Sequence, residues 1–189
     1  MPARRRNDFE LEILPHARAA YSLARWMLRN PQDAEDAVQE SVLRAYKAFD
    51  RHAGSSGSAW LLAIVRNTCL TLLERRRADR NVVVLEDQMP AGGYERRQLS
   101  ARPDPSALPD EVVIAEEERR RVHRAIAQLP LQFREVIVLR ELHDLSYREI
   151  ADVVGTPVGT VMSRLARGRE RLKTMLTERA AGDGTGTQS

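Results

Sequence analysis

The chain has 189 residues, 30% of them charged and 42% hydrophobic, with a formal net charge of +3 and an isoelectric point near 9.4. This length suffices for one ordinary domain or two small ones. Only 5% of the residues are aromatic, so any core must be aliphatic, and such a composition suits helices better than sheets. Cys69 is the single cysteine, which excludes an internal disulfide and a thiolate-rich zinc site.

No segment of the sequence is typical of a membrane span or of a signal peptide. The longest wholly apolar run covers residues 59–65, whereas crossing a bilayer takes roughly 20 apolar residues. The basic start at Arg4, Arg5 and Arg6 leads into polar residues instead of a hydrophobic stretch. We therefore expect a soluble, cytoplasmic protein with no membrane insertion.

The first part of the chain has the apolar spacing of three helices. They are expected over residues 9–27, 34–49 and 59–77, and the glycine- and serine-rich segment 52–57 separates the second from the third. Cys69 falls on the apolar side of the third helix, where a small buried residue is the expected role. Three helices of this size can form a small bundle.

A proline- and glycine-rich segment divides the chain. Four of the nine prolines fall between Pro90 and Pro109, where no apolar periodicity survives. Such a composition is typical of a linker. The expected organisation is a first domain at residues 1–78, a flexible linker at 79–110, a second domain at 111–179 and a disordered tail at 180–189.

Two short helices are expected near the end of the second domain. Ser146 and Glu149 have the spacing of a capping box, which predicts a helix start, and Gly155 can adopt the left-handed conformation that ends a helix. Thr156 is expected to cap the next helix, with Pro157 at its first position. A helix, a short turn and a second helix form the arrangement that places the second helix in the DNA major groove.

The second helix of this motif has an outward face suited to DNA. Ser163 and Arg167 are expected to read base edges, whereas the other arginines neutralise phosphates. The candidate contacts are Thr160, Met162, Ser163, Arg164, Ala166, Arg167 and Arg169. The predicted fold is all-α: two small helical domains joined by a flexible linker, the second containing a DNA-binding helix-turn-helix.

Three blocks of the sequence resemble those of bacterial sigma factors. They are residues 33–40 (DAEDAVQE), residues 60–67 (WLLAIVRN) and residues 129–171. In this order, with a proline-rich segment between the second and the third, they resemble the extracytoplasmic-function (ECF) subgroup of the sigma-70 superfamily. The resemblance implies a protein that binds core RNA polymerase and directs promoter-specific transcription initiation at −10 and −35 elements. It implies no enzymatic activity, no cofactor, no metal and no small-molecule substrate.

The resemblance assigns sigma region 2 to residues 1–78 and sigma region 4, which recognises the −35 element, to residues 111–179. In the family, the second helix of region 2 docks on the largest subunit of core RNA polymerase. The corresponding candidates here share one helix face, and they are Asp36, Gln39, Glu40 and Leu43. Acids around a small apolar contact suit a basic partner surface. A merely solvated acidic face remains the alternative interpretation of this spacing.

Family members open the promoter at the −10 element with the third helix and the loop before it, and they hold an extruded base in that loop. The corresponding candidates are His52, Ser55, Ser56, Trp60, Arg66, Asn67, Arg75 and Arg76. Asn67 has an amide that can bond a base edge, whereas the arginines can follow the DNA backbone. Trp60 as a packing residue and Asn67 as a surface amide remain open alternatives.

Some positions depart from the family pattern. Gly57 and Thr71 stand where an aromatic residue and an acid are common, so the loop pocket is expected to be looser or differently shaped. Met162 stands at a position that is often basic or polar, and it favours contact with a thymine methyl group over a guanine edge.

The resemblance further implies an anti-sigma factor as a partner. Two other functions are also considered. One is a regulator that binds a palindromic operator as a dimer without docking on polymerase. The other is a sigma-like decoy that sequesters an anti-sigma protein and binds no DNA.

Overall fold

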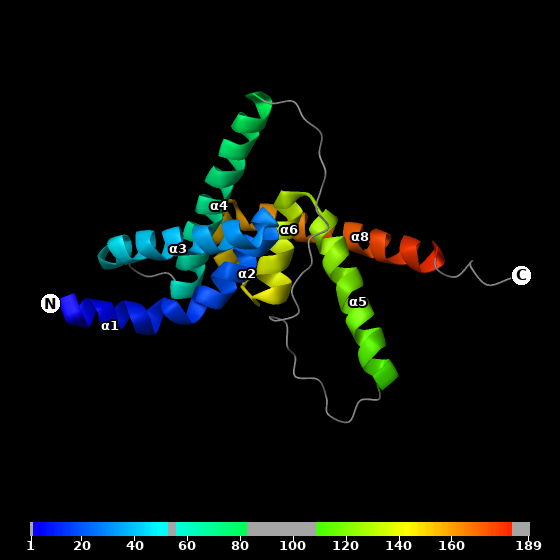
Figure 1. Cartoon of the computed structure of the whole chain (residues 1–189), viewed down its shortest axis with the longest axis horizontal. Helices are drawn as coiled ribbons and strands as arrows, with labels where there is room; N and C mark the ends of the chain where they lie inside the picture. Colours follow the sequence, from blue (N-terminus) through cyan, green and yellow to red (C-terminus); the bar gives the residue numbers. More distant parts are fainter. Residues whose placement is uncertain (1, 53–55, 83–108, 183–189) are drawn as a thin grey trace, which may run out of the picture.

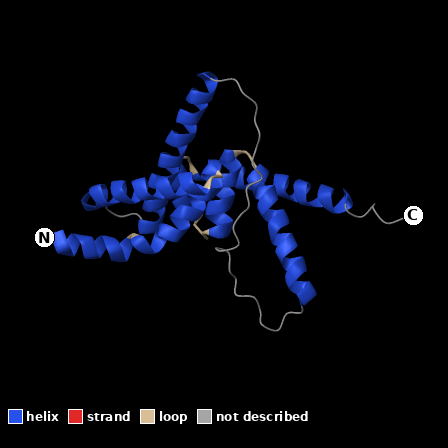
Figure 2. Cartoon of the chain, viewed as in Figure 1, coloured by secondary structure: helices blue, strands red, loops and turns tan. Residues whose placement is uncertain are grey.

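The computed structural model describes residues 2–52, 56–82 and 109–182 (Figure 1). Within these ranges every regular element is a helix, which confirms the predicted all-α fold (Figure 2). Most of the expected linker, residues 83–108, and most of the expected tail, residues 183–189, lie outside the described residues. The exact domain boundaries therefore stay a prediction.

The first expected helix is interrupted, so the prediction of one continuous helix over residues 9–27 is wrong. Helix α1 covers Pro2–Glu12, a short 3-10 turn (η1) covers Leu14–His16, and α2 covers Ala17–Leu28. Pro15 explains the break, because proline has no N–H to donate and its ring clashes with the carbonyl four residues earlier. The chain consequently changes direction between α1 and α2 (Figure 1).

Helix α3 covers Pro31–Ala48 and is followed by a second 3-10 turn (η2) at Phe49–Arg51. The side chain of Asn30 caps its start by accepting a hydrogen bond from the amide of Asp33 at 3.2 Å. Helix α4 covers Gly57–Val82 and extends beyond the expected residues 59–77 at both ends.

Helices α2, α3 and α4 pack on one another and form the predicted three-helix bundle, called here the first helical unit. Alanines on the inner face of α3 permit the close approach of the other two helices. Inside the bundle, Ser41 Oγ donates to the carbonyl of Ala37 at 2.6 Å and lies 3.1 Å from Thr68 Oγ1, so these buried hydroxyls are satisfied. The core is aliphatic, as expected, and its largest fully buried residues include Ile13, Leu23, Leu61, Leu62 and Val65.

The second helical unit contains the remaining elements. They are α5 (Pro109–Gln128), α6 (Leu131–Ile137), a π-helical turn (η3, Val138–Leu142), α7 (Tyr147–Val154) and α8 (Val158–Gly182). Helices α6 and α8 approach closely at Gly168, where a Cβ would lie 3.0 Å from Ile137 Cγ1. This contact explains a glycine inside a long helix, where it otherwise costs about 1 kcal/mol relative to alanine.

Helices α7 and α8 form the predicted helix-turn-helix. The capping box at the start of α7 is complete: Ser146 Oγ accepts from the amide of Glu149 at 3.2 Å, and Glu149 Oε2 accepts from the amide of Ser146 at 2.8 Å. Gly155 ends α7 with a φ of 67°, in the left-handed region that favours glycine.

The start of α8 lies one residue later than predicted. The amides of Thr160 and Val161 both donate to the carbonyl of Pro157, which therefore takes the capping position before Val158 in place of Thr156. The amide of Thr156 donates to the carbonyl of Ala151 at 3.2 Å, so its backbone serves to close α7. Its hydroxyl is buried and has no hydrogen-bond partner within the described residues.

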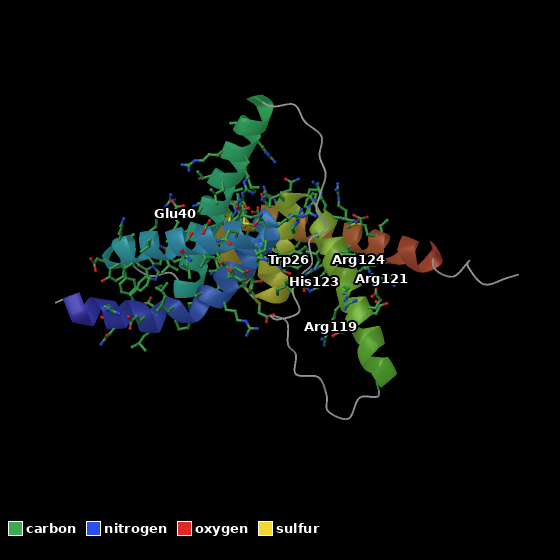
Figure 3. The ribbon with its side chains drawn as sticks, in the orientation of Figure 1. Trp26, Glu40, Arg119, Arg121, His123 and Arg124 are labelled. Atoms are coloured by element: carbon green, nitrogen blue, oxygen red, sulfur yellow. The ribbon has the colours of Figure 1, made fainter. Side chains whose placement is uncertain are left out.

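The two helical units lie against each other. Helix α7 packs on α4, α6 packs on α2, and the buried residues of both units form one continuous cluster. Figure 3 shows Trp26 of α2 near His123 of α5; their rings stack with centroids 5.1 Å apart. The sequence did not predict this contact, because it indicated only a linker between the two domains.

Candidate nucleic-acid and polymerase interfaces

The outward face of α8 is as the sequence predicted. Val161 and Leu165 are buried, whereas Met162 and Ser163 between them are exposed. Met162 is 52% exposed, the largest exposed apolar side chain on this helix. Exposed candidate contacts on this face are Met162, Ser163, Ala166 and Arg167, while Thr160 is half-buried. The face combines a cation, a hydroxyl and apolar groups, which are the groups that read base edges in a major groove.

Two of the other arginines on α8 have carboxylate partners. Arg169 donates from Nε and Nη2 to Glu141 Oε1, at 3.0 and 2.7 Å, and this hydrogen bond raises the pKa of the Arg169 guanidinium. Arg164 is only partly exposed, and its Nη1 lies 3.6 Å from Glu135 Oε1. Before either arginine can neutralise a phosphate, it must exchange or share its carboxylate.

Stacked rings lead into the start of α4. The ring of His52 lies against both Trp60, with centroids 4.4 Å apart, and Phe49, with centroids 6.4 Å apart. His52 Nε2 lies 3.2 Å from Glu12 Oε1. Trp60 is half-buried, so one part of its ring packs and another part is accessible. Ser56 is exposed, and Ser55 lies outside the described residues.

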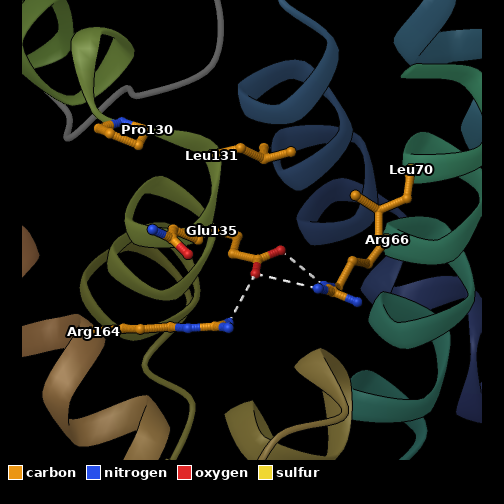
Figure 4. A pocket seen from close by; sticks show the side chains of 7 residues that line it. Arg66, Leu70, Pro130, Leu131, Glu135 and Arg164 are labelled. Atoms are coloured by element: carbon orange, nitrogen blue, oxygen red, sulfur yellow. Dashed lines mark hydrogen bonds and ion pairs between the residues drawn. The ribbon is translucent and has the colours of Figure 1, made fainter. Parts of the chain in front are cut away.

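The candidates further along α4 have different surroundings. Asn67 and Arg75 are exposed. Arg76 forms an ion pair with Asp33 of α3, which ties the C-terminal part of α4 to the start of α3. Arg66 is largely covered and donates to Glu135 of the second helical unit (Figure 4). The proposed −10 residues are therefore not equally accessible in this arrangement.

The acidic face of α3 is accessible. Asp36, Gln39, Glu40 and Leu43 are all exposed, as their spacing predicted. Leu43 is 62% exposed. Beside it, α1 and α3 enclose a surface groove of about 310 Å³ whose apolar lining includes Leu14, Val42 and Leu43. An exposed apolar centre with acids next to it is typical of a protein contact surface.

Sequence reasoning missed four residues at the contact between the units: Trp26, His123, Arg134 and Glu135. Glu135 is only 2% exposed although it is charged. The one available signal was its position, because a glutamate directly before the apolar run of residues 136–139 can face the core and then needs a cation. Nothing in the sequence indicates that this cation comes from α4, 69 residues earlier.

Comparisons with known proteins identify the family. Residues 13–79 match the family model of sigma-70 region 2, and residues 119–172 match that of sigma-70, region 4. The chain is 33% identical over 168 residues to the RNA polymerase sigma-H factor of Pseudomonas aeruginosa, covering 87% of this chain and 83% of that one. It is 38% identical over 144 residues to the ECF RNA polymerase sigma-E factor of Escherichia coli K12, covering 74% and 72%. The chain belongs to the ECF sigma factors.

An ECF sigma factor directs promoter-specific transcription initiation and is not itself an enzyme. Two solved structures resemble this sigma factor over nearly their whole length. The sigma factor RpoE in complex with the anti-sigma factor NepR, from Bartonella quintana, has a TM-score of 0.66 and 26% identity, covering 90% of this chain and 97% of that one. CnrH in complex with the cytosolic domain of CnrY has a TM-score of 0.62 and 25% identity, covering 92% and 90%.

Two further observations concern the part of the chain that the structure describes. None of its helices is long and apolar enough to cross a membrane. Its histidines, acids and Cys69 form no cluster of three or more side chains that could hold a metal ion.

Proposed function

We propose that the first helical unit of this sigma factor docks on core RNA polymerase and opens the promoter at the −10 element, while the second unit reads the −35 element as duplex DNA. The observation that carries the proposal is the exposed face of α8, which follows the capped helix α7 in a helix-turn-helix. On this face Met162 suits a thymine methyl group, and Arg167 suits a guanine edge.

The docking surface of this proposal is the exposed face of α3. Asp36 and Glu40 supply negative charge on the helix face that also carries Leu43, and the groove beside α3 continues the apolar part of the surface. A basic partner helix with an apolar centre would complement this surface in both charge and shape.

The −10 contacts of this proposal lie along α4. Asn67 is exposed and can form hydrogen bonds with an unpaired base. Arg75 is exposed further along the same helix and can contact the phosphates of the DNA backbone. The accessible part of Trp60 can stack on a base, as aromatic side chains do in single-strand binding sites.

An anti-sigma factor and a cytoplasmic location complete the proposal. Both structural relatives described above were solved with an anti-sigma partner, which supports a partner of the same class for this chain. The polymerase and the promoters on which the chain acts are in the bacterial cytoplasm, and we infer that it works there.

Transcription from a promoter library tests the α8 assignment. Purified chain and core RNA polymerase would transcribe templates randomised at the −35 element, with the −10 element held constant. Arg167→Ala is expected to cost about 1–3 kcal/mol of discrimination at one base pair of the −35 element and none at the −10 element.

Lys173→Ala is the matched control, because it removes an exposed cation from another side of α8. It is expected to lower transcription from all templates equally, since a phosphate contact carries no sequence information. An unchanged ranking of −35 sequences in Arg167→Ala would refute this role of Arg167.

A further inference from the structure

The ring of His52 lies between η2 and the start of α4. It stacks on Trp60 of α4, with centroids 4.4 Å apart and an angle of 23° between the ring planes. Its other ring neighbour is Phe49 of η2, with centroids 6.4 Å apart and an angle of 26°. The side chain of His52 is only 5% exposed. His52 therefore has little surface to offer to DNA, although it was a candidate contact for the −10 element.

Further aromatic contacts anchor this stack in the first helical unit. Phe9 of α1 is 4% exposed and meets two rings edge-on: Tyr46 of α3, with centroids 5.2 Å apart, and Phe49, with centroids 5.4 Å apart. Edge-on and offset-stacked pairs are both favoured arrangements of aromatic rings. Phe9, Phe49, His52 and Trp60 thus form a continuous row of rings, called here the aromatic row, which fixes His52 from the side of α1 and η2.

Glu12, the last residue of α1, fixes the rotation of the His52 ring. Its Oε1 lies 3.2 Å from His52 Nε2, which is a hydrogen-bond distance. An ionised carboxylate only accepts hydrogen bonds, so Nε2 donates in this contact. Stacking alone leaves a ring free to turn in its own plane, and the hydrogen bond to Glu12 removes this freedom.

Gly57 leaves room for Glu12 beside the aromatic row. Position 57 lies three residues before Trp60 on α4, so a side chain there would be a neighbour of Trp60 on the helix surface. A Cβ at Gly57 would lie 3.0 Å from the carbonyl oxygen of Glu12 and 3.2 Å from its Cγ. The end of α1 occupies this space (Figure 1). The ring that lies against Trp60 is accordingly that of His52, which comes from outside α4.

Trp60 is the half-buried end of the aromatic row. The proposed function assigns the accessible part of its ring to an unpaired base of the −10 element, and the present inference rests on that assignment. A ligand gains more from a side chain that is already fixed, because less conformational freedom is then lost on binding. The contacts of His52 and Glu12 supply this fixation in the chain without DNA.

We propose that His52 and Glu12 are positioning residues for −10 recognition. Glu12 orients the His52 ring, and the face of the His52 ring holds the ring of Trp60 in place for the unpaired base. Neither His52 nor Glu12 touches the DNA, so His52 acts through Trp60 and Glu12 acts through His52.

Binding of single-stranded DNA by the complex of the full chain with core RNA polymerase tests the proposal. A library randomised at the −10 element first identifies the template that the original chain transcribes best. The probe is a short oligonucleotide with the non-template −10 sequence of that template, titrated by fluorescence anisotropy. Trp60→Ala is expected to bind it about tenfold more weakly, and His52→Ala at least about fivefold more weakly. Binding of a duplex with the −35 element should stay unchanged in both variants.

Two substitutions of His52 separate positioning from direct contact. His52→Phe keeps a ring that can stack on Trp60 and loses only the hydrogen bond to Glu12, so it should weaken binding no more than Glu12→Ala, about twofold to threefold. His52→Lys keeps a cation that could bind a phosphate but has no ring, and it should lose as much affinity as His52→Ala. The reverse order, with the lysine variant binding well and the phenylalanine variant poorly, would overturn the inference in favour of a direct contact.

Double variants test whether each residue acts through its neighbour. His52→Ala should weaken binding less than about twofold when Trp60→Ala is already present, and so should Glu12→Ala when His52→Phe is present. Asp8→Ala is the matched control for Glu12→Ala, because it removes an exposed carboxylate one helical turn earlier on α1, and it should leave the affinity unchanged. Losses that simply add in the double variants would refute the coupling.

The fluorescence of Trp60 reports its position without any DNA. In a full chain with Trp26→Phe, Trp60 is the single tryptophan. His52→Ala should then shift the emission to longer wavelengths and increase its quenching by acrylamide, whereas His52→Phe should change both only slightly. Thermal unfolding shows whether each variant keeps its fold; should His52→Ala unfold, Glu12→Ala, at a side chain that is 48% exposed, carries the test. Identical emission and quenching in the original and the folded His52→Ala chains would contradict the positioning role.

The outcome is distinct from a failure of the proposed function. If Trp60→Ala loses affinity for the single strand but His52→Ala and Glu12→Ala do not, the proposed function stands and the inference alone is refuted. If Trp60→Ala binds the single strand as well as the original chain, the −10 role of Trp60 in the proposed function is refuted, and the inference with it.

Discussion

Cys69 has no exposed surface, and its environment sets its chemistry. It lies among aliphatic side chains on the inner side of α4, and burial raises the pKa of its thiol to about 12. The thiolate is the reactive form of cysteine, and almost none is present at neutral pH. Cys69 is therefore a small packing residue, which is the role expected from its place on the apolar side of the helix.

We expect Cys69 to resist alkylation in the folded protein. Iodoacetamide at mildly alkaline pH should modify it at least about 100-fold more slowly in the native chain than in concentrated guanidinium chloride. The variant Lys173→Cys supplies an exposed thiol as the control, and only that thiol should react in the native state. Mass spectrometry counts the modified sites. Equal rates for Cys69 in the native and unfolded chain would contradict its burial.

At the scale of elements, one face of a helix carries one function. On α3 the inner face is made of small buried residues that pack in the bundle, and the outer face carries the acids and Leu43. The two sets alternate along the chain with the helical period, so a single helix serves the core with one face and leaves the other face free for the proposed docking.

The docking role of α3 predicts a loss of polymerase binding when its acids are removed. Asp36→Ala/Glu40→Ala should weaken the complex with core RNA polymerase about tenfold, seen as loss of co-elution on a sizing column. Glu35→Ala is the control, since it removes an exposed acid from a different side of the same helix. If the double variant co-eluted as well as the control, docking would have to use another surface.

Helix α7 is short, so its cap matters more than in a long helix. Ser146→Ala removes one hydrogen bond of the capping box and should lower the free energy of unfolding by about 1 kcal/mol. Ser163→Ala, the same substitution at an exposed position of α8, should change it little. Denaturant titration followed by circular dichroism measures both. Equal stabilities of the two variants would show that the cap is dispensable.

The same cap predicts a pH dependence. The backbone amide and then the hydroxyl of Ser146 hold the pKa of Glu149 below its ordinary value of 4.5. The folded form therefore binds fewer protons at Glu149 than the unfolded form does. The ionised Glu149 stabilises the fold above about pH 4.5, and this stabilisation is lost as the pH falls through the folded pKa. Ser146→Ala should accordingly lose less stability in acid than at neutral pH.

At the scale of the whole molecule, the contact between the units buries polar groups as well as apolar ones. His123 of α5 stacks on Trp26 of α2, and burial lowers the pKa of its imidazole below the ordinary value of 6.5. The packed form thus favours the neutral ring. The neutral His123 ring therefore contributes fully to packing above about pH 6.5, and this contribution decreases as the pH falls toward the lowered pKa.

Acidification should therefore separate the units. Energy transfer between dyes on cysteines that replace Gln32 of α3 and Lys173 of α8, both exposed, is expected to lose efficiency as the pH falls below 6.5, before the helices melt. His123→Phe keeps an aromatic ring beside Trp26 and removes the titration, so its efficiency should change less over this range. Burial also lowers the pKa of His143, so this second histidine can titrate in the same range. Comparing the original chain with His123→Phe separates the two contributions. Identical curves for both chains would exclude His123 as the source.

The helix-turn-helix shows how much local sequence can determine. The capping box at Ser146, the left-handed Gly155 and the outward face of α8 were all predicted, because each depends on residues at most a few positions apart. The errors were local too. Pro15 lies inside the single helix that was expected over residues 9–27, and it interrupts that helix. Thr156 was expected to cap α8, but its amide closes α7.

The amino-acid sequence alone was enough to predict the all-α class, the bundle, the helix-turn-helix and the candidate residues of the two DNA sites and the docking face. Helical periods, caps and motif spacing are properties of short segments, so they can be found without coordinates. The family followed from the same short blocks.

The packing of the two units, and the pairing of Arg66 with Glu135, became evident from the three-dimensional fold alone. A pair of residues 69 positions apart leaves no periodic signal, and the same glutamate could have been paired within its own unit. Whether a candidate arginine is available to DNA depends on such a distant partner. The accessibility of the side of α4 that is proposed to bind the promoter is therefore a property of the packed molecule and not of its helices.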